Sequence, residues 1–160
     1  SDALLTGVID ISEKYIDIEK ILLCGQTIQI KPEGYSMYPF IVPGRDEVII
    51  EPVGSYIPKR SDIVLYRRKQ GLLVLHRIYK CTDKGFYMVG DNQTEVEGPI
   101  EYEQIKGIMT AVIRKQKKIS VGNFFYAFAG SLWLVLRPVR MYIAKPVAAV
   151  KKIFRKVVKS

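Results

Sequence analysis

The stretch DIVLYRRKQGLLVLHRIYKCTDKGFYMV, residues 62–89, decides the fold class of this chain. It contains three short runs rich in Val, Ile, Leu, Tyr and Phe, and the turn sequences KQG and TDKG separate them. Runs of this length and composition, bounded by turn residues at short intervals, are typical of β-strands joined by hairpins. The stretch therefore predicts three consecutive strands, over 62–68, 72–80 and 85–89.

The same pattern extends outward in both directions. TIQIK (27–31) and EVIIEPV (47–53) come before the quoted stretch, and IMTAVIRK (108–115) follows it. No long helical pattern lies between Thr27 and Ile113, which favours an antiparallel arrangement over βαβ units. We therefore expect a mainly β domain over 26–118, folded as an antiparallel sheet or a small barrel, with helices at both ends of the chain.

The first 25 residues are expected to form an amphipathic helix that packs on this domain. Apolar residues recur at helical intervals within 4–24, with charged residues between them: Ile11, Tyr15, Ile18 and Leu22. Gly25 is a stop signal for such a helix.

Charge divides the chain into two parts. Residues 1–103 carry all 16 acidic residues and have a net charge of −4, whereas residues 104–160 carry 13 Lys and Arg and no acid. This distribution indicates a β-rich body joined to a strongly basic C-terminal region.

Residues 119–160 are expected to associate with an anionic membrane surface. ISVGNFFYAFAGSLWLVL (119–136) is an 18-residue stretch without charge, the lower limit for a membrane-spanning helix. An apolar stripe then recurs at helical spacing among lysines and arginines, which suits an anionic lipid surface: Val147, Val150, Phe154 and Val157. The alternatives are a helix folded back on the body for 119–136 and, for the basic segment, a solvated face or a nucleic-acid contact. No DNA-reading module accompanies the segment, so no specific nucleic acid is expected.

The candidate nucleophile is Ser36, in the segment GYSMYPF (34–40). Pro39 stiffens the backbone after it, and Gly34 permits the close approach of another chain. A serine hydroxyl needs a neighbouring base, and His76 is the one histidine of the chain. An imidazole with a pKa of about 6.5 could accept the serine proton.

The surroundings of His76 allow two interpretations. In a strand over 72–80 it shares a face with Val74 and Ile78, while Arg77 points the opposite way. A histidine on such a face can be a core residue satisfied by one hydrogen bond, or a catalytic base in a dry pocket. Asp91, in VGDNQ, is the candidate group that orients the imidazole, although Gly-Asp-Asn is also common turn chemistry.

No metal or cofactor is expected. Cys24 and Cys81 form no CxxC pair and no metal-ligand pattern with His76, and both are expected to be small buried residues. The alternative is a disulfide, which requires that the domain face an oxidising compartment.

Together, GYSMYPFIVPGRDEVIIEPV, VLHRIYK and VGDNQ resemble the three catalytic boxes of the signal peptidase I-like and LexA-like serine peptidases (the S24/S26 group). They occur in the family's order within residues 34–93. Histidine at position 76 is similar to the endoplasmic-reticulum-type branch, whose base is histidine rather than lysine. The resemblance implies Ser36 as nucleophile, His76 as base and Asp91 as its assistant.

The resemblance also implies a coiled, largely β core that binds an extended peptide or preprotein and cuts it after small residues. It implies a membrane-associated endopeptidase that processes signal or leader sequences at the cytoplasmic membrane. Two departures stand out: the position of the family's second oxyanion donor is Gly34, and Ser61-Asp62 replaces the usual Gly-Asp pair. No N-terminal membrane anchor is visible in the sequence.

Two other functions fit the same residues. A LexA-like self-cleaving cytoplasmic regulator would be expected to have a lysine base and an N-terminal DNA-binding module, and 25 residues are too short for one. A non-catalytic adaptor could keep the fold and dock on a membrane through its basic region.

Overall fold

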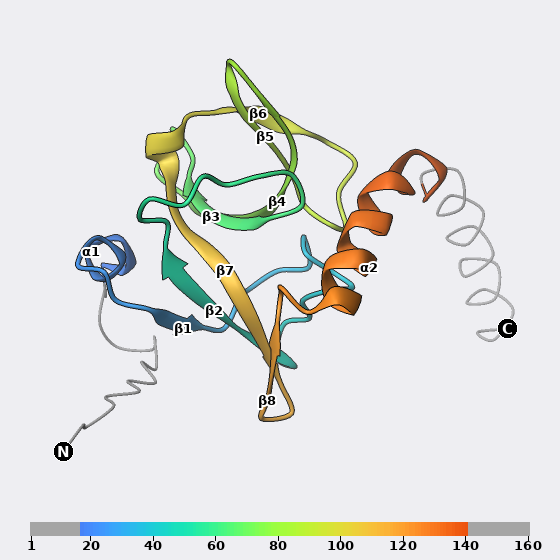
Figure 1. Ribbon diagram of the computed structural model, residues 1–160, viewed down its shortest axis with the longest axis horizontal. Helices are drawn as coiled ribbons and strands as arrows, with labels where there is room; N and C mark the ends of the chain where they lie inside the picture. The colour runs from blue at the N-terminus through green and yellow to red at the C-terminus, as the bar shows by residue number, and fades with distance from the viewer. Residues whose placement is uncertain (1–16, 141–160) are drawn as a thin grey trace, which may run out of the picture.

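The computed structural model describes residues 17–140, which form one open, eight-stranded antiparallel sheet with a short helix at each end (Figure 1). The strand order is β1-β2-β7-β3-β4-β5-β6. On the β3 side of β7, β3 pairs with its first half and β8 pairs with its second half, residues 111–114. The mainly β class and the antiparallel arrangement predicted from the sequence are therefore confirmed.

The elements have the following bounds: α1 Ile18–Leu23, β1 Ile28–Ile30, β2 Asp46–Pro52, β3 Ile63–Arg67, β4 Leu73–Thr82, β5 Gly85–Val89, β6 Glu97–Ile100, the 3-10 turn η1 Tyr102–Gln104, β7 Ile105–Arg114, β8 Lys117–Ser120 and α2 Phe124–Val135. The six predicted strands correspond to β1–β5 and β7, whereas β6 and β8 were not predicted. Both missed strands are four residues long and lack the alternation of apolar and polar residues that identifies a half-buried strand.

The sheet is buried on both faces where β3 and β4 run side by side. On one face Val64, Tyr66 and Ile78 pack with Met88 and Ile100, and on the other Ile63 and Leu65 belong to a second cluster. Because successive side chains of a strand point to opposite faces, neighbouring residues of β4 enter different cores. This property separates the surroundings of His76 from those of Arg77.

The N-terminal helix is shorter than expected within the described residues. Prediction placed a helix over 4–24, and α1 covers Ile18–Leu23 of it; residues 1–16 lie outside the described part of the chain. Gly25 adopts a left-handed φ of +78° just after the helix, as a C-terminal stop residue does. The expected stop signal is confirmed.

The uncharged stretch 119–136 is not a single helix. Ile119 belongs to β8, and α2 begins only at Phe124, where the Asn123 side chain accepts a hydrogen bond from the Phe125 N–H. Helix α2 lies against the body, as the alternative of a folded-back helix expects. The basic stripe after residue 140 lies outside the described residues.

Within residues 17–140, no helix has the length and apolar character needed to cross a membrane.

The expected burial of the two cysteines is wrong. Cys24, directly after α1, and Cys81, near the end of β4, are both exposed and free. Each lies at the end of an element rather than within a core, so apolar packing does not account for either residue.

Candidate active site

The segment that carries Ser36 is held to the body by apolar side chains that follow the serine. Met37 and Ile41 are 4% and 2% exposed and belong to the core under β2 and β7. Phe40 packs edge-on against two aromatic rings of α2, those of Tyr126 and Trp133. The serine is thus placed by its neighbours, while Ser36 itself is only half-buried.

A buried carboxylate secures the far end of this segment. Asp46 accepts hydrogen bonds from the Val42 N–H and from the guanidinium groups of Arg45 and Arg114. Arg114, on β7, also donates to the Phe40 carbonyl at 3.0 Å. Burial works to raise the pKa of Asp46, but these donors together hold it well below its ordinary value. The chain from residue 40 to β2 is therefore fixed by charge as well as by packing.

The loop after β5 touches the backbone of Ser36 directly. The Asn92 N–H donates to the Ser36 carbonyl at 2.8 Å. A Cβ at Gly90 would lie only 2.7 Å from that same oxygen, which is closer than real Cβ contacts allow. The glycine of the Gly-Asp-Asn sequence is therefore required by the close approach of this loop to Ser36.

His76 lies on β4, paired across the sheet with Val64 of β3, and is 3% exposed. Its Nδ1 atom is 3.1 Å from the hydroxyl oxygen of Tyr66. The Tyr66 hydroxyl in turn donates to Glu97 Oε2 at 2.9 Å, and Arg68 donates to the same carboxylate at 2.6 and 2.9 Å. A continuous hydrogen-bonded chain thus runs from Arg68 through Glu97 and Tyr66 to the imidazole.

The protonation states along this chain assign the tautomer of His76. Burial and the nearby Glu97 raise the pKa of Tyr66, so its hydroxyl keeps its proton. Burial works to raise the pKa of Glu97, but hydrogen bonds from Arg68 and Tyr66 hold it below its ordinary value, so Glu97 is an acceptor. Because Tyr66 gives its single proton to Glu97, it accepts from Nδ1–H of His76. The Nε2 atom is left with a free lone pair, which is what a general base requires.

His76 is uncharged at neutral pH. Burial, assisted by the positive charge of Arg68, lowers its pKa to about 4, while Glu97 acts in the opposite direction. An imidazole in this state can accept a proton without first having to lose one.

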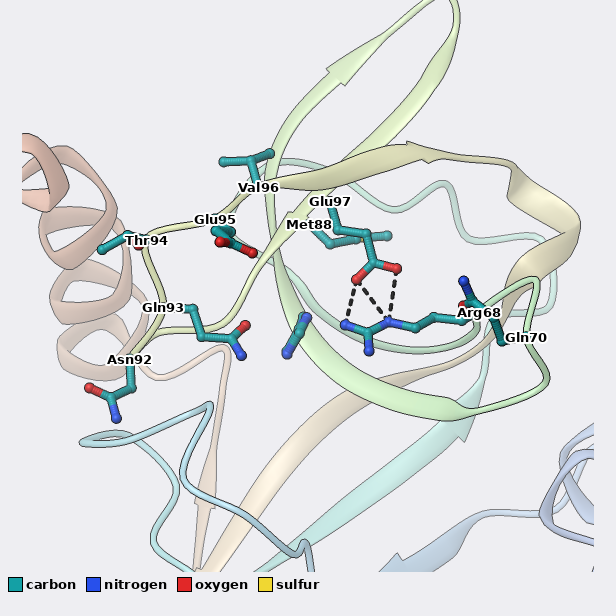
Figure 2. Close-up of a pocket in the computed structure, with 10 residues that line it drawn as sticks. Arg68, Gln70, Met88, Asn92, Gln93, Thr94, Glu95, Val96 and Glu97 are labelled. Atoms are coloured by element: carbon teal, nitrogen blue, oxygen red, sulfur yellow. Dashed lines mark hydrogen bonds and ion pairs between the residues drawn. The ribbon is translucent and has the colours of Figure 1, made fainter.

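A pocket of about 660 Å³ opens beside His76 (Figure 2). Its wall on one side is the loop from Asn92 to Val96, and on the other side are Arg68 and Gln70. Most of the lining is polar, with Met88 and Val96 as its apolar members. The pocket is large enough to receive part of a peptide next to the imidazole.

The loop after β5 connects the surroundings of Ser36 with those of His76. Asn92 binds the Ser36 carbonyl and also lines the pocket to which His76 contributes. Within residues 17–140 no hydrogen bond joins the Ser36 hydroxyl to the His76 ring. Catalytic hydrogen bonds are often long in the absence of substrate and tighten when it binds.

Asp91 is placed with Arg77 rather than with His76. Its two carboxylate oxygens accept from Arg77 Nε and Nη2, both at 2.7 Å, and the two side chains are 0% and 3% exposed. Because His76 and Arg77 are neighbours on β4, their side chains lie on opposite faces, and Asp91 lies on the Arg77 side. The expected support of His76 by Asp91 is not seen in the described residues, where Tyr66 occupies the Nδ1 side.

The Asp91–Arg77 pair instead joins three parts of the site. Arg77 also donates to the Ser61 carbonyl and lies over the Phe40 ring at 5.0 Å. The Asp91 carbonyl accepts from Trp133 Nε1 at 2.8 Å, which ties the loop to α2. The pair therefore positions the Ser36 segment and the Gly-Asp-Asn loop relative to each other.

Sequence reasoning did not identify Tyr66, Glu97 or Arg68 as site residues. The position of Tyr66 could have been predicted in part. If a tight turn joins β3 and β4, Tyr66 lies on the same face of the sheet as the pair Val64–His76. Glu97 lies in β6, whose Gly-Pro sequence gives no strand signal, so its approach to Tyr66 depends on the folded sheet.

Scans of the chain against protein-family models, curated proteins and solved structures found no match. Among residues 17–140, no three His, Cys, Asp or Glu side chains are grouped so that they could hold a metal ion.

Proposed function

We propose that this protein is a serine endopeptidase of the signal peptidase I-like type, with Ser36 as nucleophile and His76 as general base. The observation that carries the proposal is the chain Arg68–Glu97–Tyr66–His76, which leaves the imidazole neutral with Nε2 unprotonated. A histidine that merely satisfied the core would not need a pocket on one side and an anchored serine beside the same loop. The order of the three sequence boxes supports the same assignment.

In the proposed reaction, the Ser36 hydroxyl attacks the carbonyl carbon of an extended peptide, and His76 Nε2 takes the proton. The Nδ1–H···Tyr66 hydrogen bond, with Glu97 behind it, stabilises the imidazolium that forms. The proton then passes to the leaving amine, and an ester between Ser36 and the N-terminal fragment remains. Water hydrolyses this ester with His76 again as base. The backbone N–H of Ser36 has no hydrogen-bond partner within residues 17–140 and is the proposed oxyanion donor.

We also propose that the sheet adopts the coiled arrangement of the LexA and signal peptidase group and that the natural substrates are signal or leader sequences. Small residues before the cut are the family's preference. The polar lining of the pocket beside His76 makes polar side chains near the cut a second class to examine.

The test compares cleavage of leader peptides by the full chain and by two variants, Ser36→Ala and His76→Ala. The peptides carry small residues before the scissile bond, with Ser, Gln, Lys and Glu substituted in turn at the flanking positions. Wild-type protein should cut at least one peptide at a single site, and both variants should lose this activity. Equal cleavage by all three proteins would defeat the mechanism, and no cleavage of any peptide would favour a non-catalytic adaptor.

A further inference from the structure

Helix α2 has one face committed to the candidate active site. Tyr126 and Trp133 contact Phe40, and Trp133 Nε1 donates to the Asp91 carbonyl at 2.8 Å. At Gly130 the helix backbone comes so close to Arg77 that a Cβ would lie 2.6 Å from Nη1. These contacts fix the rotation of the helix about its axis. The opposite face must therefore point away from the body.

That opposite face is apolar and exposed. Five large side chains, which we call the outer face, fall within an arc of about 100° at 100° per residue. They are Phe124 (73% exposed), Phe125 (78%), Phe128 (57%), Leu132 (43%) and Val135 (59%). Three aromatic rings stand together at the start of the helix, where Phe124 stacks on Phe128 at 6.0 Å. Of the two α-helices within residues 17–140, only α2 presents such a row to solvent.

The segments that precede and follow α2 in the sequence carry charge of one sign. The β7–β8 hairpin, which leads into α2 through residues 121–123, carries three exposed lysines: Lys115, Lys117 and Lys118. No acidic residue occurs anywhere in the chain after Glu103, and residues 141–160 add six further Lys and Arg. A second copy of this chain would bring the same positive charge to the contact. Anionic lipid headgroups offer charge of the opposite sign together with an apolar interior.

We propose that the outer face of α2 lies in the interface of an anionic membrane, parallel to its surface, with the hairpin lysines on the lipid phosphates. Aromatic side chains on one face of a helix and lysines beside them are the pattern of an interfacial, non-spanning anchor. This arrangement replaces a membrane-spanning 119–136 segment by a helix that lies on the lipid. It also leaves α1 at the other end of the molecule from the anchor (Figure 1).

The anchor has a consequence for catalysis, which rests on the proposed peptidase function. The inner face of the same helix holds Phe40 and the Asp91 loop, so docking would place Ser36 and His76 close to the lipid surface. A cleavage site that emerges from the membrane next to an apolar leader segment would then be within reach. Docking itself does not depend on this function and can be tested without any substrate.

The experiment is flotation of the full chain with vesicles of phosphatidylcholine alone or of phosphatidylcholine mixed with phosphatidylglycerol. The main variant replaces Phe124, Phe125 and Phe128 by Ser. The matched control is Leu23→Ser, an apolar residue 83% exposed at the end of α1, far from α2. A third variant replaces Lys115, Lys117 and Lys118 by Gln. Circular dichroism and thermal unfolding check that every variant is folded.

Wild type and Leu23→Ser should float with the anionic vesicles and much less with the neutral ones. The triple Phe variant should lose at least tenfold in partition coefficient, and the lysine variant about fivefold per lysine, less in high salt. Unchanged flotation of the triple Phe variant would overturn the proposal and point to residues 141–160 as the sole anchor. A wild-type dimer in size-exclusion chromatography that becomes a monomer in this variant would overturn it in favour of a second copy.

Discussion

At the scale of single residues, the central feature is a buried histidine whose tautomer is fixed by a tyrosine. The Tyr66 hydroxyl lies between His76 Nδ1 and the Glu97 carboxylate. The Glu97 carboxylate therefore acts on the imidazole through this buried hydroxyl and not by direct contact. The arrangement keeps the charged groups at the pocket edge, where Arg68 and Glu97 are each about one-third exposed, and leaves only neutral groups beside the imidazole. The tautomer is fixed without burying a carboxylate against the ring.

Replacing Tyr66 by Phe should therefore reduce catalysis more than it reduces stability. The change leaves Nδ1–H without its acceptor and allows the unproductive tautomer, at a cost of about 1–3 kcal/mol, which corresponds to a fall in kcat/KM of about fivefold to 160-fold. The matched control is Tyr56→Phe, which removes a hydroxyl that donates to Asp62 on the surface. Peptide cleavage kinetics and thermal unfolding measure the two effects. Full activity of Tyr66→Phe would remove Tyr66 from the mechanism.

The pH dependence of stability should report the buried imidazole. With the pKa of His76 lowered from 6.5 to about 4, the unfolded chain binds a proton between these pH values that the native state does not. Stability is therefore complete above pH 6.5 and is lost as the pH falls towards 4, by about 3 kcal/mol in total. The free energy of unfolding of wild type and His76→Gln, measured with denaturant at each pH, should differ in its pH dependence. Only the wild type should show the additional loss between pH 6.5 and 4. Equal slopes would contradict a buried neutral His76.

Catalysis should follow the same titration. Because His76 must be neutral to accept the Ser36 proton, kcat/KM should hold from neutral pH down to about 5 and fall near 4. An acid limb near 6.5 would mean that the imidazole is solvated in the working enzyme. The fall in kcat/KM near pH 4 must be distinguished from acid unfolding. Samples returned from low pH to neutral pH should therefore recover full activity.

At the scale of elements, the site depends on close approaches of backbone. The loop after β5 meets the Ser36 carbonyl at Gly90, and α2 meets Arg77 at Gly130. Both positions require glycine because a Cβ would collide with a neighbouring group, and not because the backbone adopts an unusual φ. The loop, the serine segment and α2 consequently form one packed unit around the Asp91–Arg77 pair.

Gly90→Ala tests this unit. The added methyl group would push on the Ser36 carbonyl, and a displacement of about 1 Å can reduce catalysis about a hundredfold. Gly122→Ala is the control, because the nearest atom to its Cβ is Ser120 Oγ at 3.5 Å. We expect Gly90→Ala to be folded but nearly inactive and Gly122→Ala to match the wild type, as measured by circular dichroism and peptide cleavage. Wild-type activity in Gly90→Ala would show that the loop does not position Ser36.

Asp91→Asn separates positioning from direct support of His76. The substitution leaves Arg77 as a buried charge without its partner, which costs about 3–5 kcal/mol. We expect a large fall in the free energy of unfolding and an unchanged acid limb in the pH profile of the remaining activity. A shift of the acid limb in Asp91→Asn, and none in Tyr66→Phe, would instead restore Asp91 as the group that assists His76.

Sequence patterns were sufficient to predict the long strands. They were insufficient to predict the short strands and the turns that depend on contacts in the folded sheet. Strands β3–β5 are recognisable as apolar runs between turn residues, because each carries apolar side chains that are buried in a core. The β7–β8 hairpin turns at Lys115 and Gln116, with φ of +49° and +62°, and neither residue type signals such a turn. Ser36 and His76 were identifiable as the hydroxyl and the single imidazole. Glu97 was not, because only the folded sheet brings it to Tyr66.

At the scale of the whole molecule, the boundary between the acidic and the basic part of the chain lies just before β7, within the β domain. The body up to residue 103 has a net charge of −4, and the remainder has +13. Helix α2 belongs structurally to the body, since its inner face covers the Ser36 segment. The division by charge is therefore not a division into separate folding units.

Two truncations should consequently behave differently. Removal of residues 141–160 leaves in place the contacts that α2 makes within residues 17–140, so we expect unchanged cleavage of soluble peptides and weaker flotation with anionic vesicles. Removal of 119–160 deletes α2 and half of β8, which uncovers Phe40 and should abolish both activity and cooperative unfolding. Thermal unfolding and peptide cleavage measure both outcomes. A stable, active product of the larger deletion would show that α2 is not part of the catalytic unit.

The most direct test of the central claim is intact-mass analysis of the full chain shortly after mixing with a cleavable leader peptide. We predict a transient adduct equal to the acyl group of the N-terminal fragment, located on Ser36 by peptide mapping and absent in Ser36→Ala and His76→Ala. Peptide cleavage that proceeds in the wild type without an adduct, and persists undiminished in Ser36→Ala, would contradict it.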